Sequence, residues 1–152
     1  MAKGGQLLDW KKEAENDLKA HEKRKAALRS LAEEIRELQA RTYGSTAPAA
    51  DAVPVQGGTS TAEKRLIAAI DELERKKGAY RATKRKVDAV ERGLATLTAQ
   101  QVDILDRFFI HRTRGHVQAL AEAYHVEQSR VYTLKDDAVR DFTLARYGVV
   151  DS

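Results

Sequence analysis

The chain has 152 residues and a formal net charge of +4, with 42% hydrophobic, 33% charged and 6% aromatic residues. This composition, with few aromatics, is typical of long helices and coiled coils, so we expect an all-α fold. The absence of cysteine excludes disulfides and thiolate metal sites, and no apolar run approaches the roughly 20 residues that cross a bilayer, so we expect a cytoplasmic protein without membrane contact.

Residues 1–41 are predicted to form a long amphipathic helix. Neither proline nor glycine occurs between Gln6 and Arg41, and apolar or small residues recur in alternating steps of three and four. These seam positions are Leu7, Trp10, Ala14, Leu28, Leu31, Ile35 and Leu38. The middle of the seam is polar, because Asp17, His21 and Arg24 stand between Ala14 and Leu28.

Residues 42–60 are predicted to be a flexible linker, because they hold both prolines and three of the nine glycines without any apolar period. A second long amphipathic helix is predicted over residues 61–96. Ser60 and Glu63 have the spacing of a capping box at its start, and Gly93 is expected to mark its frayed end. Its seam comprises Leu66, Ile70, Leu73, Lys77, Tyr80, Val87 and Leu94, with Lys84 as a further polar interruption.

The two long helices are expected to associate. A helix with a single apolar stripe cannot bury that stripe by itself, so each helix needs a partner surface. They can fold back as an antiparallel helical hairpin, or they can pair between subunits as a coiled coil, and the sequence leaves both arrangements open. We therefore expect a homo-oligomer, with a dimer favoured.

Residues 97–152 are predicted to form a three-helix domain that contains a helix-turn-helix. Thr98 and Gln101 have capping-box spacing at the start of its first helix. The expected buried face of that helix comprises Val102, Leu105, Phe108 and Phe109. A connector over 111–116 precedes a short helix over 117–124 and a tight turn over 125–127. The last helix is expected over 128–146, with Gly148 placed to end it.

The pattern of the last two helices predicts a DNA-reading element. A helix-turn-helix needs apolar residues and one small residue where its helices cross, with exposed polar residues at the start of the second helix. The crossing positions are filled by Leu120, Ala121, Tyr124, Val126, Val131 and Leu134. The residues left outward are Gln128, Ser129, Arg130, Tyr132, Thr133 and Lys135, whose side chains suit contacts with bases and phosphates.

Local charge agrees with DNA binding. Residues 97–152 carry seven Lys/Arg and eight Asp/Glu, but residues 107–135 carry five and two. Arg112 and Arg114 in the connector are predicted to bind phosphates, whereas the acidic residues Asp136, Asp137 and Asp141 are expected to face away from the groove. His125 stands in the turn where a glycine would relieve backbone strain.

The run LTAQQVDILDRFFIHRTRGHVQALAEAYHVEQSRVYTLKDDAV resembles the C-terminal helix-turn-helix with which bacterial sigma factors recognise the −35 promoter element. The specific points of likeness are Leu97-Thr98, Ala121 and Val131-Tyr132. With its two long charged helices and its linker, the chain resembles phage late-gene transcriptional regulators of the RinA/ArpU type. The resemblance implies a bacterial host cell and DNA contacts by Gln128, Ser129, Arg130 and Thr133.

Other candidate sites are weak in this sequence. His111 and His116 are five residues apart, off the spacing that shares a helix face, and His21 stands by itself, so solvated or helix-end histidines are expected rather than metal ligands. Neither a phosphate loop nor a pair of catalytic carboxylates is present, so we expect neither an enzyme nor a cofactor. The basic run over 75–86 fits either nucleic-acid contact or a helix with alternating charges.

The sequence thus predicts a DNA-binding transcriptional regulator acting at promoters, with double-stranded DNA as its partner. The long helices would join two reading domains, or they would dock on RNA polymerase. The alternative is a phage structural, assembly or DNA-packaging protein, in which the coiled coil drives oligomerisation and the C-terminal bundle is a docking module.

Overall fold

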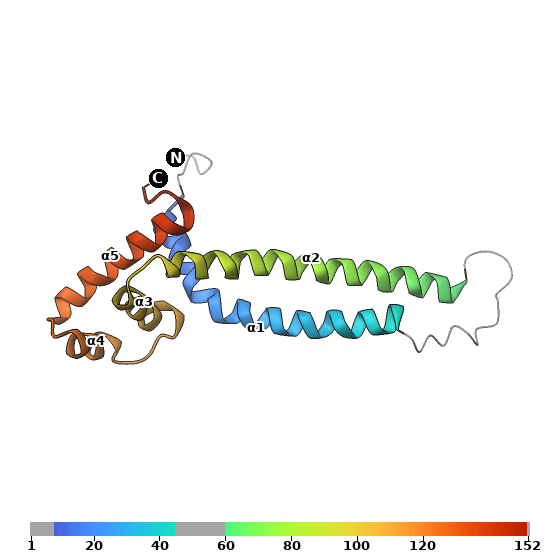
Figure 1. The fold of residues 1–152 in the computed structure, drawn as a ribbon, viewed down its shortest axis with the longest axis horizontal. Coiled ribbons are helices and arrows are strands. Elements are labelled where there is room, and N and C mark those ends of the chain that lie inside the picture. Colours follow the sequence, from blue (N-terminus) through green and yellow to red (C-terminus); the bar gives the residue numbers. More distant parts are fainter. Residues whose placement is uncertain (1–7, 45–59, 152) are drawn as a thin grey trace, which may run out of the picture. The chain divides into compact units, whose positions relative to one another are not determined.

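A computed structural model describes residues 8–44 and 60–151, and all regular structure within these ranges is helical (Figure 1). The elements are α1 (Trp10–Tyr43), α2 (Thr61–Ala95), α3 (Ala99–Leu105), a π-helical turn (Asp106–Ile110), α4 (His116–Tyr124) and α5 (Gln128–Tyr147). The predicted all-α class is therefore confirmed. Most of the predicted linker over 42–60 lies outside the described residues. Within the described part of the chain, the helices are too short or too polar to cross a membrane.

The chain divides into two compact units. Unit 1 comprises residues 1–24 and 86–152, and unit 2 comprises residues 25–85. Helices α1 and α2 each contribute one end to unit 1 and the remainder to unit 2. Unit 1 is thus larger than the domain predicted over 97–152, because the first turns of α1 and the last turns of α2 belong to its core.

The first core of unit 1 joins four helices. Its buried residues are Ala14, Leu18, Val90, Leu105, Ala138, Val139 and Phe142. Ala14 and Leu18 come from α1 and Val90 from α2, so segments far apart in the sequence meet around α5. This shared apolar burial explains why the ends of the long helices belong to unit 1.

The polar positions of the α1 seam have dedicated partners in unit 1. Asp17 is only 6% exposed, and it accepts hydrogen bonds from the Arg24 guanidinium at 2.9 Å and from the Tyr147 hydroxyl. The Arg146 guanidinium completes this set with an ion pair to Asp17 at 3.3 Å. Burial, followed by the hydrogen bond to Asp17, raises the pKa of Tyr147 to about 12. The buried carboxylate is therefore paired, as a charge in a protein interior must be.

His21 is buried as well, which corrects the expectation of a solvated histidine. It is 4% exposed, and its Nε2 lies 3.6 Å from a carboxylate oxygen of Glu91 on α2. The residue one turn earlier on α1, Asp17, is also buried. The polar middle of the predicted seam is therefore an interface with other elements of unit 1 rather than a gap in a coiled coil.

Gly93 lies in the last turn of α2, which ends at Ala95, and it is buried. A Cβ atom at this position would lie 2.9 Å from Cε1 of Phe142 on α5. The glycine therefore allows the Phe142 ring to lie directly against the α2 backbone. Its predicted place near the end of the helix is confirmed, but this end is packed against Phe142 rather than frayed.

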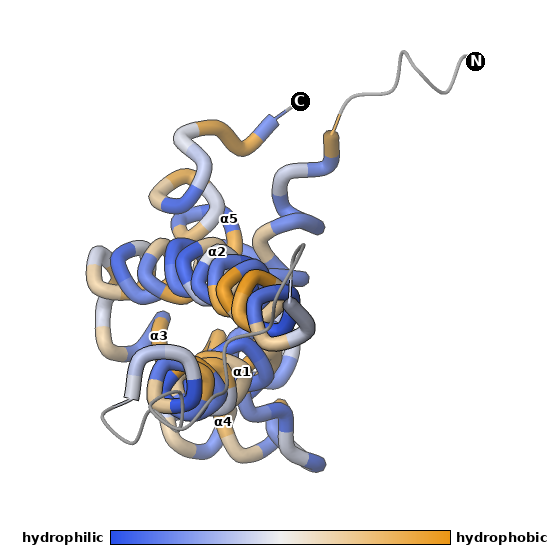
Figure 2. Tube along the Cα trace, turned by 90° about the vertical axis from the view of Figure 1, so that its right-hand side faces the viewer, coloured by the Kyte–Doolittle hydropathy of each residue, from blue (hydrophilic) through white to orange (hydrophobic). Residues whose placement is uncertain are grey.

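Unit 2 contains the remaining turns of α1 and α2, which lie side by side (Figure 1). Lys76 of α2 donates to Glu34 of α1 at 2.7 Å. Among the described residues of this unit, the buried hydrophobic side chains are Leu38 and Leu73, whereas Leu66 is 45% exposed. Figure 2, which views α1 and α2 nearly end-on, shows hydrophilic and hydrophobic residues mixed in both helices. The predicted seam is present, but it is buried much less than its periodicity suggests.

Candidate nucleic-acid interface

Helices α4 and α5 pack on α3 around the second core of unit 1. Its buried residues are Ile104, Phe108, Leu120, Ala121 and Val131, and Tyr124, Val126 and Leu134 pack against them. All of the predicted crossing residues therefore take part in this core. Ile104, which is 1% exposed, was not predicted to be buried, because it lies between two positions of the expected apolar stripe.

The turn between α4 and α5 has the geometry that its sequence suggests. His125 adopts the left-handed conformation, with φ 57° and ψ 47°, at the C-terminal end of α4. The backbone N–H groups of His125 and Val126 both donate to the carbonyl of Ala121. The left-handed conformation expected at His125 is therefore present, and it generally costs a residue with a Cβ roughly 1–2 kcal/mol.

Helix α5 begins at Gln128, with Glu127 as its N-cap in an extended conformation. The Glu127 side chain makes no capping hydrogen bond, so the first backbone N–H groups of α5 have no side-chain cap. At the other end, α5 stops at Gly148 with φ 75°, as predicted. The uncapped first turn of α5 is the part of the helix on which the predicted contact residues begin.

The predicted contact residues of α5 fall into two groups. Gln128, Ser129, Arg130 and Thr133 are exposed and do not belong to the core. Tyr132 is also exposed, but its ring and the Lys135 side chain pack against the core residue Phe108. The Tyr132 ring lies 6.0 Å from that of Phe108, and Lys135 Nζ lies 5.7 Å from the same ring. Lys135 also pairs with Asp136 at 2.8 Å. The first group therefore points to solvent, with the Thr133 hydroxyl donating to the Ser129 carbonyl at 3.4 Å, and the second packs against the π-helical turn that follows α3.

The connector between the π-helical turn and α4 exposes Arg112 and Arg114. Within residues 8–44 and 60–151, neither these guanidinium groups nor that of Arg130 has a hydrogen-bond or ion-pair partner. The neighbouring histidines are engaged: His111 Nδ1 lies 2.6 Å from Asp106, and the His116 ring packs edge-on against Phe108. The hydrogen bond with Asp106 raises the pKa of His111. The three arginines are therefore available for an anionic partner.

The acidic residues of α5 do not all face away from the contact residues, which corrects the sequence analysis. Asp136 and Asp137 follow Ser129 and Arg130 by seven residues, so the helical repeat places them on the same exposed stripe. They are separated from the contact residues along the helix by about 10 Å rather than around it. The first two turns of α5 therefore form a positive segment and the next turns an acidic one.

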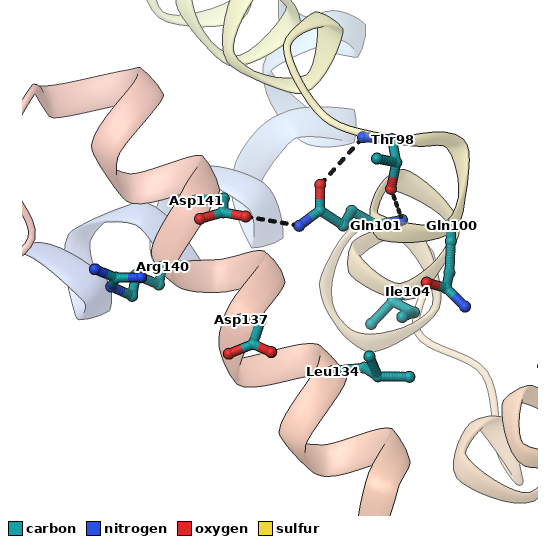
Figure 3. Close-up of a pocket in the computed structure, with 8 residues that line it drawn as sticks. All are labelled: Thr98, Gln100, Gln101, Ile104, Leu134, Asp137, Arg140 and Asp141. Atoms are coloured by element: carbon teal, nitrogen blue, oxygen red, sulfur yellow. Dashed lines mark hydrogen bonds between the residues drawn. The ribbon is translucent and has the colours of Figure 1, made fainter. Parts of the chain in front are cut away.

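An open polar hollow lies between α3 and α5 (Figure 3). Thr98 and Gln101 form the predicted capping box, with both hydrogen bonds at 3.1 Å. The Gln101 amide also donates to Asp141 of α5 at 2.8 Å (Figure 3). The hollow is therefore part of the joint that fixes α3 to α5, and Asp141 is turned toward that joint.

Comparison of the chain with protein-family models, with curated proteins and with solved structures gave no match. The RinA/ArpU resemblance therefore stays a prediction, and the geometry described above is what bears on function.

Proposed function

We propose that this protein binds duplex DNA sequence-specifically and regulates transcription at promoters. The observation that carries the proposal is a set of three exposed arginines, Arg112, Arg114 and Arg130, which have no partner within the described residues. They lie on a helix-turn-helix whose crossing residues pack around one core. An unpaired guanidinium keeps its five donors for phosphate or base acceptors.

In the proposed complex, the first two turns of α5 enter the major groove. Arg130 and Gln128 have the side chains that read guanine and adenine edges, respectively. Arg112 and Arg114, on the connector before α4, bind phosphates and fix the register of the helix. The acidic turn at Asp136 and Asp137 then limits how much of α5 lies close to the phosphates.

We also propose a biological setting for this activity. The resemblance to phage late-gene regulators favours an activator that works in the bacterial cytoplasm. A homodimer would place two recognition helices on paired half-sites and raise avidity through effective concentration. Alternatively, the long helices would dock on RNA polymerase instead of forming the homodimer.

The first test is a binding selection on random duplex DNA at two salt concentrations, followed by affinity measurements on the enriched and random sequences. Arg130→Ala is expected to lower discrimination between them by about 1–3 kcal/mol. Arg140→Ala is the matched control, because Arg140 is an exposed arginine of the same helix within the acidic segment. Equal losses on enriched and random DNA, or no enriched motif, would contradict the proposal.

A second candidate function is that of an assembly protein. It is favoured by three large hydrophobic side chains that are exposed in unit 2, namely Tyr43, Leu66 and Ile67. An assembly protein would self-associate through apolar contacts, and it would bind DNA weakly without sequence preference. Self-association by light scattering that persists at high salt, together with a selection that enriches no motif, would favour this function.

A further inference from the structure

The α2 segment over 75–86 has seven Lys/Arg and no acidic residue. The remaining residues are Gly78, Ala79, Tyr80, Ala82 and Thr83. Unit 2 as a whole, residues 25–85, has 12 Lys/Arg and 8 Asp/Glu, whereas the rest of the chain has 15 of each. The entire net charge of +4 therefore comes from unit 2 rather than from the unit with the helix-turn-helix.

The cations of this segment are not equivalent. Lys76 is used inside unit 2, because its ammonium group donates to Glu34 at 2.7 Å and lies 3.9 Å from Glu72. Arg75, Arg81 and Arg85 are exposed, and their guanidinium groups have neither a hydrogen bond nor an ion pair within the described part of the chain. Ion pairs within unit 2 therefore give Lys76 a structural role, whereas the three arginines have no such role in the described part of the chain.

The three arginines share one side of α2. The helical repeat of 100° places them within about 120° of each other, with Gly78 and Ala82 between them. A Cβ atom at Gly78 would meet no other atom within 4 Å, so packing does not require a glycine there. A glycine inside a helix costs roughly 1 kcal/mol relative to alanine. The outer face of α2, defined here as Arg75, Gly78, Arg81, Ala82 and Arg85, is thus cationic, with small residues between its arginines.

The chemistry of this face selects among anionic partners. An amphipathic membrane helix or a protein interface needs a core of large apolar side chains, and the outer face of α2 has none. Guanidinium groups around small residues suit a polyanion whose backbone approaches closely. The distance from Arg75 to Arg85 along the helix is about 15 Å, which corresponds to about four phosphates of one DNA strand.

We propose that the outer face of α2 is a second nucleic-acid surface, which binds the phosphate backbone of duplex DNA without reading its sequence. The choice of duplex DNA rather than RNA rests on the proposed function, whereas the surface itself follows from unit 2. It adds affinity and salt dependence to the complex, and sequence discrimination stays with α5.

The test compares two variants of the full chain that lose the same charge. Arg75→Gln/Arg81→Gln/Arg85→Gln removes the three cations of the outer face, and Lys11→Gln/Lys19→Gln/Lys23→Gln removes three exposed cations of α1 in unit 1. Binding of random-sequence duplex DNA is followed by fluorescence anisotropy over a range of salt concentrations. In the arginine variant, the slope of log K against log salt is expected to become less steep by about 2–3, because each lost phosphate contact reduces the magnitude of the negative slope by about 0.9.

The expected result is a weaker, less salt-dependent complex for the arginine variant only, with an unchanged ratio of affinities for enriched and random DNA. Equal effects of both variants indicate a response to net charge and overturn the proposal, as does an unchanged slope in the arginine variant. The same measurement is made with duplex RNA of the same length. If the arginine variant binds only the RNA more weakly, the assignment of this surface to DNA is overturned. A further outcome is that Arg130→Ala leaves the ratio of affinities for enriched and random DNA unchanged while the triple arginine variant shows a less steep salt dependence. In that case the proposed base-reading role of Arg130 fails and the proposal for the outer face of α2 stands.

Discussion

Units 1 and 2 are built from the same two long helices, yet they differ in what holds them together. Unit 1 has two buried clusters that draw on α1, α2, α3, α4 and α5. Unit 2 has Leu38 and Leu73 as the buried hydrophobic side chains among its described residues, and it carries the whole net charge. One helix can therefore be a core element over part of its length and a charged surface over the rest.

The comparison also shows that a regular apolar repeat is a poor guide to burial. The polar part of the α1 seam, at Asp17 and His21, is almost completely buried in unit 1. The apolar part, at Leu28, Leu31 and Ile35, is only half-buried in unit 2. Burial follows the number of partner elements around a segment, and a third element such as α5 supplies it where a helix pair does not.

The largest expected effect is in the core of unit 1. Phe142→Ala removes a fully buried ring that lies against Gly93, and it should lower the free energy of unfolding by about 3–5 kcal/mol. Urea denaturation followed by circular dichroism measures this loss. The control is Leu144→Ala on the same helix, where the side chain is 49% exposed and the change should stay within about 0.5 kcal/mol. Similar losses for both variants would contradict the description of this core.

A smaller and more local effect is expected in unit 2. Leu73→Ala should cost about 2 kcal/mol, at the low end for a buried leucine, because its half-buried neighbours can close around the site. Hydrogen exchange should accelerate in the unit 2 part of α2 and stay unchanged in α4. Leu66→Ala is the control, since this exposed leucine should change exchange little. Faster exchange throughout both units would show that they unfold together.

The smallest effect concerns the turn of the helix-turn-helix. His125→Gly removes the steric strain of a left-handed residue but adds entropy to the unfolded chain, so it should raise the free energy of unfolding by about 0.5 kcal/mol. His125→Ala keeps the Cβ and should give no gain. Thermal unfolding of the three proteins measures the difference. A stabilising alanine would mean that the ring, rather than the backbone conformation, carries the strain.

The sequence by itself determined the features that depend on neighbouring residues. The capping box of Thr98 and Gln101, the left-handed turn at His125 and the stop at Gly148 were all predicted, because each involves hydrogen bonds or dihedral angles within a few residues. The crossing residues of α4 and α5 were predicted for the same reason, since the two helices are adjacent in the chain.

Only the tertiary structure decided the features that join distant segments. Tyr147 donates to Asp17 across 130 residues, and Phe142 lies against Gly93, so neither partner could be identified from periodicity. The same holds for charge: Lys76 and Arg75 are neighbours in the sequence, but only Lys76 meets a carboxylate of α1. A pattern in the sequence states which side chains share a face, whereas the packing of other elements decides which of them remain free to bind a partner.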